Sequence, residues 1–178
     1  MIYDITQEVF SARVYPGDPH PAFRRIKSFE QGDMSTVTEI TLQVHAGTHL
    51  DAPIHRVQGG KGMDEIPLEK CIGEAVVIDY LAGLPPESLA PRVLLKNCDC
   101  IDEAAAQLLL DRQVVFVAVE GPSVGNRAVH RMLLEKEVAV LEGAALAQVP
   151  PGEYLLFAAP MLLGGCDGAP VRAVLMTR

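Results

Sequence analysis

The sequence predicts a mixed α/β domain in which a barrel-like sheet is flanked by a few helices. Short runs rich in β-branched residues outnumber the helical segments, and helices alternate with strands in the second half of the chain. No internal repeat, low-complexity segment or linker divides the 178 residues. A chain of this length suits one domain that buries most of its apolar surface without disulfides. We therefore expect a single domain over residues 1–178.

The first predicted strand covers residues 38–44, where apolar and polar side chains alternate. This period of two is typical of a strand with one buried face. The other predicted strands are short, apolar and rich in β-branched residues. They span residues 75–80, 93–95, 114–119, 138–141, 154–158 and 171–176.

Two helices are predicted between these strands. The first covers residues 102–112 and carries Asp and Glu in its first turn, where negative charge favours the helix dipole. The second covers residues 126–137 and begins at Asn126, a residue type that caps helix N-termini. Its apolar stripe consists of Val129, Met132 and Leu133.

The composition excludes several classes of protein. Hydrophobic residues make up 49% and charged residues 21% of the chain, which excludes a disordered protein. The formal net charge is -8 and no cluster of Lys and Arg occurs, so we expect binding neither to nucleic acid nor to anionic membranes. Aromatic residues are 5% and Trp is absent, which also argues against a platform for stacking bases.

The chain carries the marks of a cytoplasmic protein. The best apolar run, residues 114–119, is of strand length and far shorter than the ~18 residues that cross a bilayer. The N-terminal segment is acidic and lacks the basic-then-apolar pattern of a signal peptide. Cys98 and Cys100 are separated by one residue, too close for an ordinary disulfide, and no C-x-x-C pair occurs. We therefore expect reduced thiols.

Three histidines and an aspartate fall within residues 45–55, in the stretch HAGTHLDAPIH. A helix could bring His45 and His49 together, but Gly47 and Pro53 argue against a helix here. The spacings of four, two and four residues are all even, so an extended chain would point His45, His49, Asp51 and His55 from one face. We therefore expect these four side chains to converge.

Imidazole and carboxylate groups together are ligands of Zn²⁺, Mn²⁺ or Fe²⁺. Two histidines and one carboxylate leave coordination positions open, which is the pattern of a catalytic site. The alternative is that these histidines are ordinary hydrogen-bonded residues. His130 and Glu142, at the ends of a predicted helix and strand, are weaker candidates, because isolated polar residues are common there.

The stretch 45–55 resembles the H-x-G-T-H-x-D-x-P-x-H signature of the metal-dependent "putative cyclase" family, which includes bacterial kynurenine formamidases and isatin hydrolases. Every fixed position of that pattern is present. Further segments that resemble the family are Tyr-Pro-Gly-Asp-Pro at 15–19, Ala-Val-Glu-Gly-Pro-Ser-Val at 118–124, residues 129–131 with 140–143, and the Gly-Gly-Cys-Asp-Gly-Ala-Pro-Val-Arg run at 164–172.

The resemblance implies a swivelling β/β/α fold and a homo-oligomer, either dimer or tetramer. It implies one or two Zn²⁺ or Mn²⁺ ions, and a small-molecule substrate with an amide, formamide or lactam-like C–N bond. The implied roles are first metal ligands for His45, His49 and Asp51, ligands completing a second metal position for His130 and Glu142, and proton shuttle for His55. His130 and Glu142 are otherwise open to a supporting role behind the ligands.

Three features depart from the family pattern. Trp is absent, Glu120 and Gly121 stand where Asp-Thr is usual, and only residues 125–129 separate Val124 from His130. The short loop motivates an alternative function, a catalytically inactive protein that binds a metal or small molecule. Ser123 lacks a G-x-S-x-G context, so it is not expected to be a nucleophile. We expect the glycine-rich residues 164–168 to form a tight hairpin turn.

Overall fold

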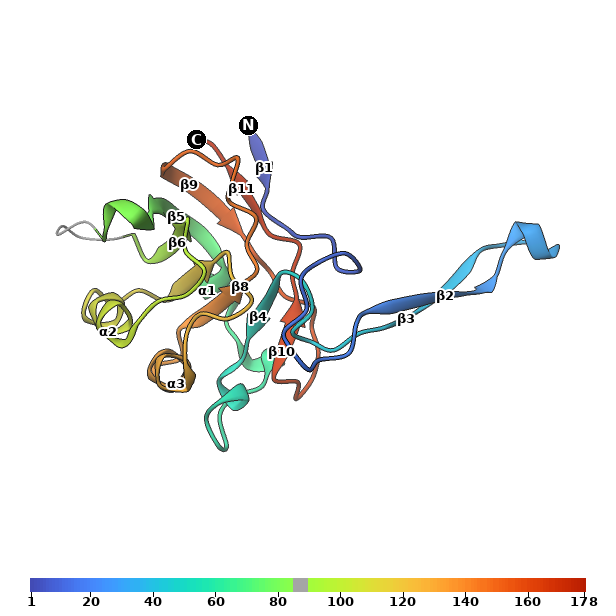
Figure 1. The fold of residues 1–178 in the computed structure, drawn as a ribbon, viewed down its shortest axis with the longest axis horizontal. Helices are drawn as coiled ribbons and strands as arrows, with labels where there is room; N and C mark the ends of the chain where they lie inside the picture. The colour runs from blue at the N-terminus through green and yellow to red at the C-terminus, as the bar shows by residue number, and fades with distance from the viewer. Residues whose placement is uncertain (85–89) are drawn as a thin grey trace.

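The computed structural model describes residues 1–84 and 90–178. In it a curled sheet of nine strands forms the body, and a two-stranded hairpin projects from the body as an arm (Figure 1). The strands are β1 (Ile2–Asp4), β2 (Ala22–Lys27), β3 (Val37–Thr41), β4 (His49–Asp51), β5 (Ile72–Asp79), β6 (Arg92–Lys96), β7 (Phe116–Val119), β8 (Ala139–Glu142), β9 (Gly152–Phe157), β10 (Gly168–Pro170) and β11 (Val174–Met176). The helices are α1 (Leu68–Cys71), α2 (Glu103–Asp111) and α3 (Arg127–Glu135), with 3-10 turns η1 (Phe29–Gln31), η2 (Pro53–His55), η3 (Met63–Glu65) and η4 (Tyr80–Ala82).

The sheet has the strand order β1-β11-β9-β5-β6-β7-β8-β4-β10. Its centre, from β5 to β8, is parallel, and the strands on both sides are antiparallel. Parallel strands of this kind are covered on both faces. Accordingly all four residues of β7 and all four of β8 are buried.

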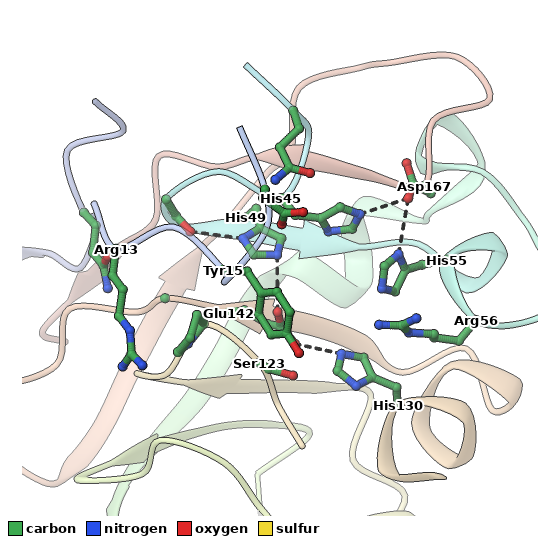
Figure 2. Close-up of a pocket in the computed structure, with 16 residues that line it drawn as sticks. Arg13, Tyr15, His45, His49, His55, Arg56, Ser123, His130, Glu142 and Asp167 are labelled. Atoms are coloured by element: carbon green, nitrogen blue, oxygen red, sulfur yellow. Dashed lines mark hydrogen bonds and ion pairs between the residues drawn. The ribbon is translucent and has the colours of Figure 1, made fainter. Parts of the chain in front are cut away.

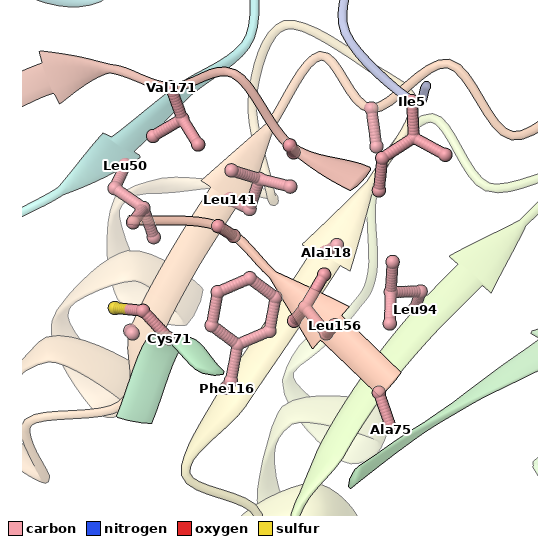
Figure 3. Packing of buried hydrophobic residues seen from close by; sticks show 14 of the residues in the cluster. Ile5, Leu50, Cys71, Ala75, Leu94, Phe116, Ala118, Leu141, Leu156 and Val171 are labelled. Atoms are coloured by element: carbon pink, nitrogen blue, oxygen red, sulfur yellow. The ribbon is translucent and has the colours of Figure 1, made fainter. Parts of the chain in front are cut away.

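Alternation along the central strands divides the core into two layers. Val93 and Leu95 of β6 pack with side chains of α2 and α3, which lie together on one side of the sheet (Figure 1). Leu94 points the other way, into the hollow of the curled sheet, where it packs around Phe116 (Figure 3). Leu141 of β8 and Leu156 of β9 complete this inner layer. The packing of this inner layer stabilises the curvature of the sheet and fixes the position of β8.

Both predicted helices are present. The second follows its predicted cap, Asn126, whereas Asp102, placed by the sequence in the first turn of the other helix, is the cap of that helix. The Asp102 carboxylate accepts a hydrogen bond from the Ala105 amide at 2.8 Å, and the Asn126 side-chain oxygen accepts one from the Val129 amide at 3.0 Å. These bonds satisfy amide groups that the first turn of a helix leaves free. The cap at Asn126 fixes the start of α3 at Arg127, three residues before His130.

Six of the predicted strands correspond to β5, β6, β7, β8, β9 and β11, and the predicted mixed α/β class with a curled sheet is confirmed. The prediction for residues 38–44 is wrong in two respects. The strand ends at Thr41, and every residue of β3 is exposed because β3 pairs only with β2 in the arm. Alternation shows which side chains share a face, and here no element of the described chain covers that face.

The turn predicted for residues 164–168 is present. The Cys166 amide donates to the Leu163 carbonyl at 3.3 Å, and Gly165 has a φ of 70°. Residues Gly168–Pro170 then form β10, the outer strand beside β4. In the described part of the chain, no helix has the length and hydropathy to cross a membrane.

Candidate metal centre

The strand pair β4–β8 places the first three side chains of the site. β4 is buried throughout and lies between β8 and β10, with His49 directly opposite Glu142. Side chains two residues apart on a strand share a face, so His49 and Asp51 point the same way. His49 Nε2 consequently lies 3.5 Å from Asp51 Oδ1 and 3.3 Å from Glu142 Oε2.

His130 enters this group from α3. Its Nε2 atom lies 2.9 Å from Glu142 Oε1 and 3.4 Å from Asp51 Oδ2. The Val124 amide also donates to Glu142 Oε1, at 2.6 Å, which fixes the carboxylate. Two imidazoles and two carboxylates from β4, β8 and α3 therefore meet around one buried point (Figure 2).

The hydrogen bonds on the far side of each ring decide which nitrogen faces this point. His49 Nδ1 lies 3.0 Å from the Gly47 carbonyl, and His130 Nδ1 lies 3.3 Å from the Asn126 carbonyl. A carbonyl oxygen only accepts, so both Nδ1 atoms carry the hydrogen. In the neutral rings, the Nε2 lone pairs then face carboxylates, so either a proton on Nε2 or a metal ion between the groups is needed to make that arrangement favourable. Histidine ligands of metals are oriented in this way.

Two atoms at this point are buried without a hydrogen-bond partner, His49 Nε2 and Asp51 Oδ2. Buried polar atoms are rarely left so. Burial disfavours the imidazolium, yet Asp51 and Glu142 outweigh it and raise the pKa of His49 to about 10 and that of His130 to about 9. The group therefore has a high affinity for positive charge. His49, Asp51, Glu142 and His130 fit a divalent cation by donor type and by these unsatisfied atoms.

A second group shares Asp51 with the first. His45 Nδ1 lies 3.0 Å from Asp51 Oδ1, and its Nε2 lies 2.9 Å from Asp167 Oδ2. The same Asp167 oxygen lies 3.2 Å from His55 Nδ1. His45, Asp51 and His55 offer atoms close enough to hold one ion, beside the group formed by His49, Asp51 and Glu142. The structure thus brings all six predicted site residues together.

The residues 45–55 converge by a different route from the one predicted. The chain is not extended throughout, because a turn closes with the Ala46 amide donating to the Gln43 carbonyl at 3.2 Å. Gly47 then adopts a φ of 64°, and His55 ends the 3-10 turn η2. The prediction of a single extended face is therefore wrong, although two of its members, His49 and Asp51, do lie on one strand.

Asp167 is the site residue that the sequence reasoning missed. It precedes β10, whose Gly168 lies opposite Asp51, and its carbonyl accepts from the Ala52 amide at 2.9 Å. Gly168 has no room for a side chain, since an added Cβ would lie 2.9 Å from His45 Cε1. An aspartate beside a glycine in the run 164–172, which resembles the family's closing segment, was the available signal.

The site forms the floor of a cavity of about 330 Å³. This volume falls within the range of small-molecule sites. The four histidines of the site and Glu142 line it, together with Tyr15 and Ser123 (Figure 2). The Ser123 hydroxyl donates to the Gly125 carbonyl at 3.0 Å rather than to a histidine, so this structure gives it no base that could activate it.

The family model described as "Putative cyclase" matches residues 3–98 of the chain. This protein belongs to the cyclase family. It is 33% identical over 204 residues to a kynurenine formamidase of Salinibacter ruber, covering 98% of this chain and 96% of the relative. The predicted family is therefore confirmed.

Two solved structures are similar to this chain in fold. A potential metal-dependent hydrolase with cyclase activity is 29% identical, with a TM-score of 0.80 over 98% of this chain and 96% of its own. Isatin hydrolase A from Labrenzia aggregata is 22% identical, with a TM-score of 0.82 over 100% of this chain and 94% of its own, and it shows the shared fold. The prediction of a metal-dependent hydrolase is confirmed.

Proposed function

We propose that this cyclase-family protein hydrolyses a C–N bond of a small linear or cyclic amide. The observation that carries the proposal is the pair of buried imidazoles whose Nε2 atoms face two carboxylates at the floor of a small-molecule cavity. Relatives named kynurenine formamidase and isatin hydrolase support an amide as the substrate. Imidazole and carboxylate donors suit Zn²⁺ or Mn²⁺, bound as one or two ions.

Each side chain has a part in this proposal. When bound, the ion lowers the pKa of a water molecule and polarises the amide carbonyl. His49, Asp51 and Glu142 would hold it together with His130, whose Nε2 faces the same two carboxylates. His45 lies beside this group, with Nδ1 toward Asp51 and Nε2 toward Asp167. The shared Asp51 is held as a carboxylate, because neighbouring imidazoles outweigh burial and keep its pKa well below the usual value.

His55 is placed to move the proton. Its Nδ1 faces the Asp167 carboxylate, so Nδ1 carries a hydrogen and Nε2 is left to act as base. Burial, aided by the nearby His45 and Arg56, lowers the pKa of His55 below its ordinary value in spite of Asp51 and Asp167. His55 is therefore neutral at pH 7. It can accept a proton from the attacking water and return it to the leaving nitrogen.

A metal analysis joined to a substrate panel tests this function. Protein purified without chelator should contain at least one equivalent of Zn²⁺ or Mn²⁺, and anomalous diffraction should place it between His49, Asp51, Glu142 and His130. Aryl formamides, isatin and cyclic amides should include a substrate. A protein that cannot be loaded contradicts the proposal. A loaded protein that turns over none of them under either metal is instead the inactive binding protein.

We also propose that the protein works as a homo-oligomer joined through the arm formed by β2, η1 and β3. Both faces of the arm are exposed, and a two-stranded hairpin alone is marginally stable in water. Its exposed apolar side chains include Phe23, Phe29, Met34 and Ile40, with Met34 97% exposed. Such a surface requires a partner.

A second copy of this chain is the partner that fits the arm. Residues 21–42 contain three basic and three acidic side chains and are neutral, so a body of net charge -8 does not repel them. Two exchanged arms would each bring about as many residues as one side of a standard interface. Each copy carries its own arm, so a symmetric pair covers both arms at once.

Sedimentation velocity of the full chain tests the oligomer. The protein should sediment at a multiple of 19.2 kDa, and Phe29→Ser with Met34→Ser should shift it towards the single-chain mass. Leu81→Ser, which removes an apolar side chain outside the arm that is more exposed than Phe29 and less exposed than Met34, should leave the mass unchanged. A wild-type protein at the single-chain mass at tens of micromolar contradicts the proposal.

We place the protein in the cytoplasm. The four cysteines are free, and Cys100 is exposed, as expected where thiols stay reduced. Fractionation of the source cells, with a periplasmic marker as control, checks this. Recovery with the periplasmic marker would contradict it.

A further inference from the structure

Two arginines line the cavity above the metal-binding residues, and the function proposed so far uses neither for binding. Arg13 lies on the loop that follows β1, and Arg56 directly follows His55. They approach from opposite sides of the cavity, and the Arg56 side chain extends between His55 and His130 (Figure 2). Two positive charges therefore border the space where a substrate would lie.

Within residues 1–84 and 90–178, neither guanidinium group has an ion-pair or hydrogen-bond partner, whereas most other arginines do. Arg24, Arg131 and Arg172, for example, contact acids at 2.6, 2.6 and 2.5 Å. Among the described residues, three arginines contact neither an acid nor a hydrogen-bond acceptor, and two of the three line this cavity. These three are Arg13, Arg56 and Arg127.

The charged groups that share the cavity do not neutralise these two. Asp51, Glu142 and Asp167 face the histidines. Asp18 lines the cavity too, but within the described chain it forms no ion pair with either arginine. The guanidinium groups therefore keep their charge for a ligand.

We infer that Arg13 and Arg56 recognise a carboxylate on the substrate, so that the amide cleaved here is an anionic one. This inference rests on the proposed amide hydrolysis and names the class of amide. A guanidinium presents paired N–H donors that match the two oxygens of a carboxylate, and such bonds are the strong ones. The arginines thus determine substrate specificity: they hold the carboxylate of the substrate while its amide group reaches the metal-binding residues.

An isosteric pair of substrates isolates the charge. The Zn²⁺-loaded protein is assayed with 3-formamidobenzoate, with its neutral analogue 3-formamidobenzamide and with the cationic 3-(aminomethyl)formanilide. The ratio of kcat/KM for benzoate over benzamide should be about tenfold or more, the size of a charge-assisted hydrogen bond. Arg56→Gln and Arg13→Gln should each reduce that ratio by a similar factor, mainly through KM of the benzoate.

Arg127→Gln is the matched control, because it removes the same charge from an unpaired arginine that lies outside the cavity. Its ratio should stay at the wild-type value, which separates local recognition from the overall charge of the protein. A preference for benzoate that survives in both cavity variants would mean that the metal or another group binds the anion, and would overturn the inference. Equal rates, or a preference for the cationic amide, would overturn it as well.

Binding separates this inference from the proposed function. If no amide is turned over, hydrolysis fails, yet calorimetry still compares the affinities of the benzoate and the benzamide. Tighter benzoate binding that is lost in Arg56→Gln and Arg13→Gln supports the arginine site without any chemistry. Equal affinities in the wild-type protein refute it.

Discussion

The metal centre and the projecting arm are both built on short strands, but these strands differ strongly in burial and in how many neighbouring strands hold them. β4 is three residues long, is buried throughout, and is held by β8 on one side and β10 on the other. β2 and β3 are longer, pair only with each other, and are exposed throughout. Position in the fold, and not strand length, therefore decides how rigidly a side chain is held. Ligands belong on the first kind of strand and adaptable contacts on the second.

The most disruptive substitution in the metal centre removes Asp51, the residue that both ligand groups share. Asp51→Ala should abolish metal binding and reduce kcat/KM by at least ~10³-fold, because a metal that supplies the nucleophile is lost. Metal content by mass spectrometry and activity on an aryl formamide measure the two effects. Asp111→Ala, which changes an exposed acid on α2, should alter neither. Stoichiometric metal in Asp51→Ala would show that the centre is not built around this carboxylate.

A substitution of His55 should separate metal binding from catalysis. His55→Gln should keep its metal and lose about 10²–10⁴-fold in kcat, the range for removing a general acid–base group. The ring faces Asp167 and is not required by the His49, Asp51 and Glu142 group. Metal content and kcat are measured on the same sample. Loss of metal would make His55 a ligand, and unchanged turnover would exclude it as the proton carrier.

A substitution in the packing behind the ligands should reduce activity by a smaller factor. Gly168→Ala places a Cβ 2.9 Å from His45 Cε1 and 3.0 Å from the Leu50 carbonyl oxygen, so the His45 ring or the β10 backbone must shift. We expect about a 10–100-fold loss of kcat/KM, since small displacements of catalytic groups have effects of this size. Gly164→Ala is the control, because its new Cβ would meet its nearest neighbour, Asp64, only at 3.9 Å. Equal activities of the two variants would mean that the position of His45 does not matter.

The same contrast explains how much the sequence could predict. His45, His49, Asp51 and His55 lie so close together along the chain that a turn or a strand brings them to one place, and their chemistry identified the site. His130 and Glu142 needed the family pattern as well. Asp167 is 112 residues from His55, and the pairing of β10 with β4 brings it there. Local periodicity carries no record of that pairing.

The errors in the predicted fold have the same origin. β4, with the sequence His-Leu-Asp, has little intrinsic strand preference, and its neighbours impose the extended conformation. β3 has a clear alternation, which correctly indicated a strand, but burial depends on what covers the face. In both strands the missing information lies in residues distant in sequence. The central strands and the capped helices needed no such information, because they are apolar or capped on their own.

The smallest expected effect compares one side chain from each region. Leu50→Ala in β4 removes a side chain that is 1% exposed and should lower the free energy of unfolding by about 2–5 kcal/mol. Ile40→Ala in the arm, where the side chain is 54% exposed, should change it by less than about 0.5 kcal/mol in dilute protein. Urea unfolding at low and high protein concentration measures both. If the arm is an interface between copies, the cost of Ile40→Ala grows with concentration while that of Leu50→Ala does not, because only the arm's contacts depend on a second chain. A cost for Ile40→Ala that is large even at high dilution would show that the arm is buried against its own body, and the contrast between the two regions would fall.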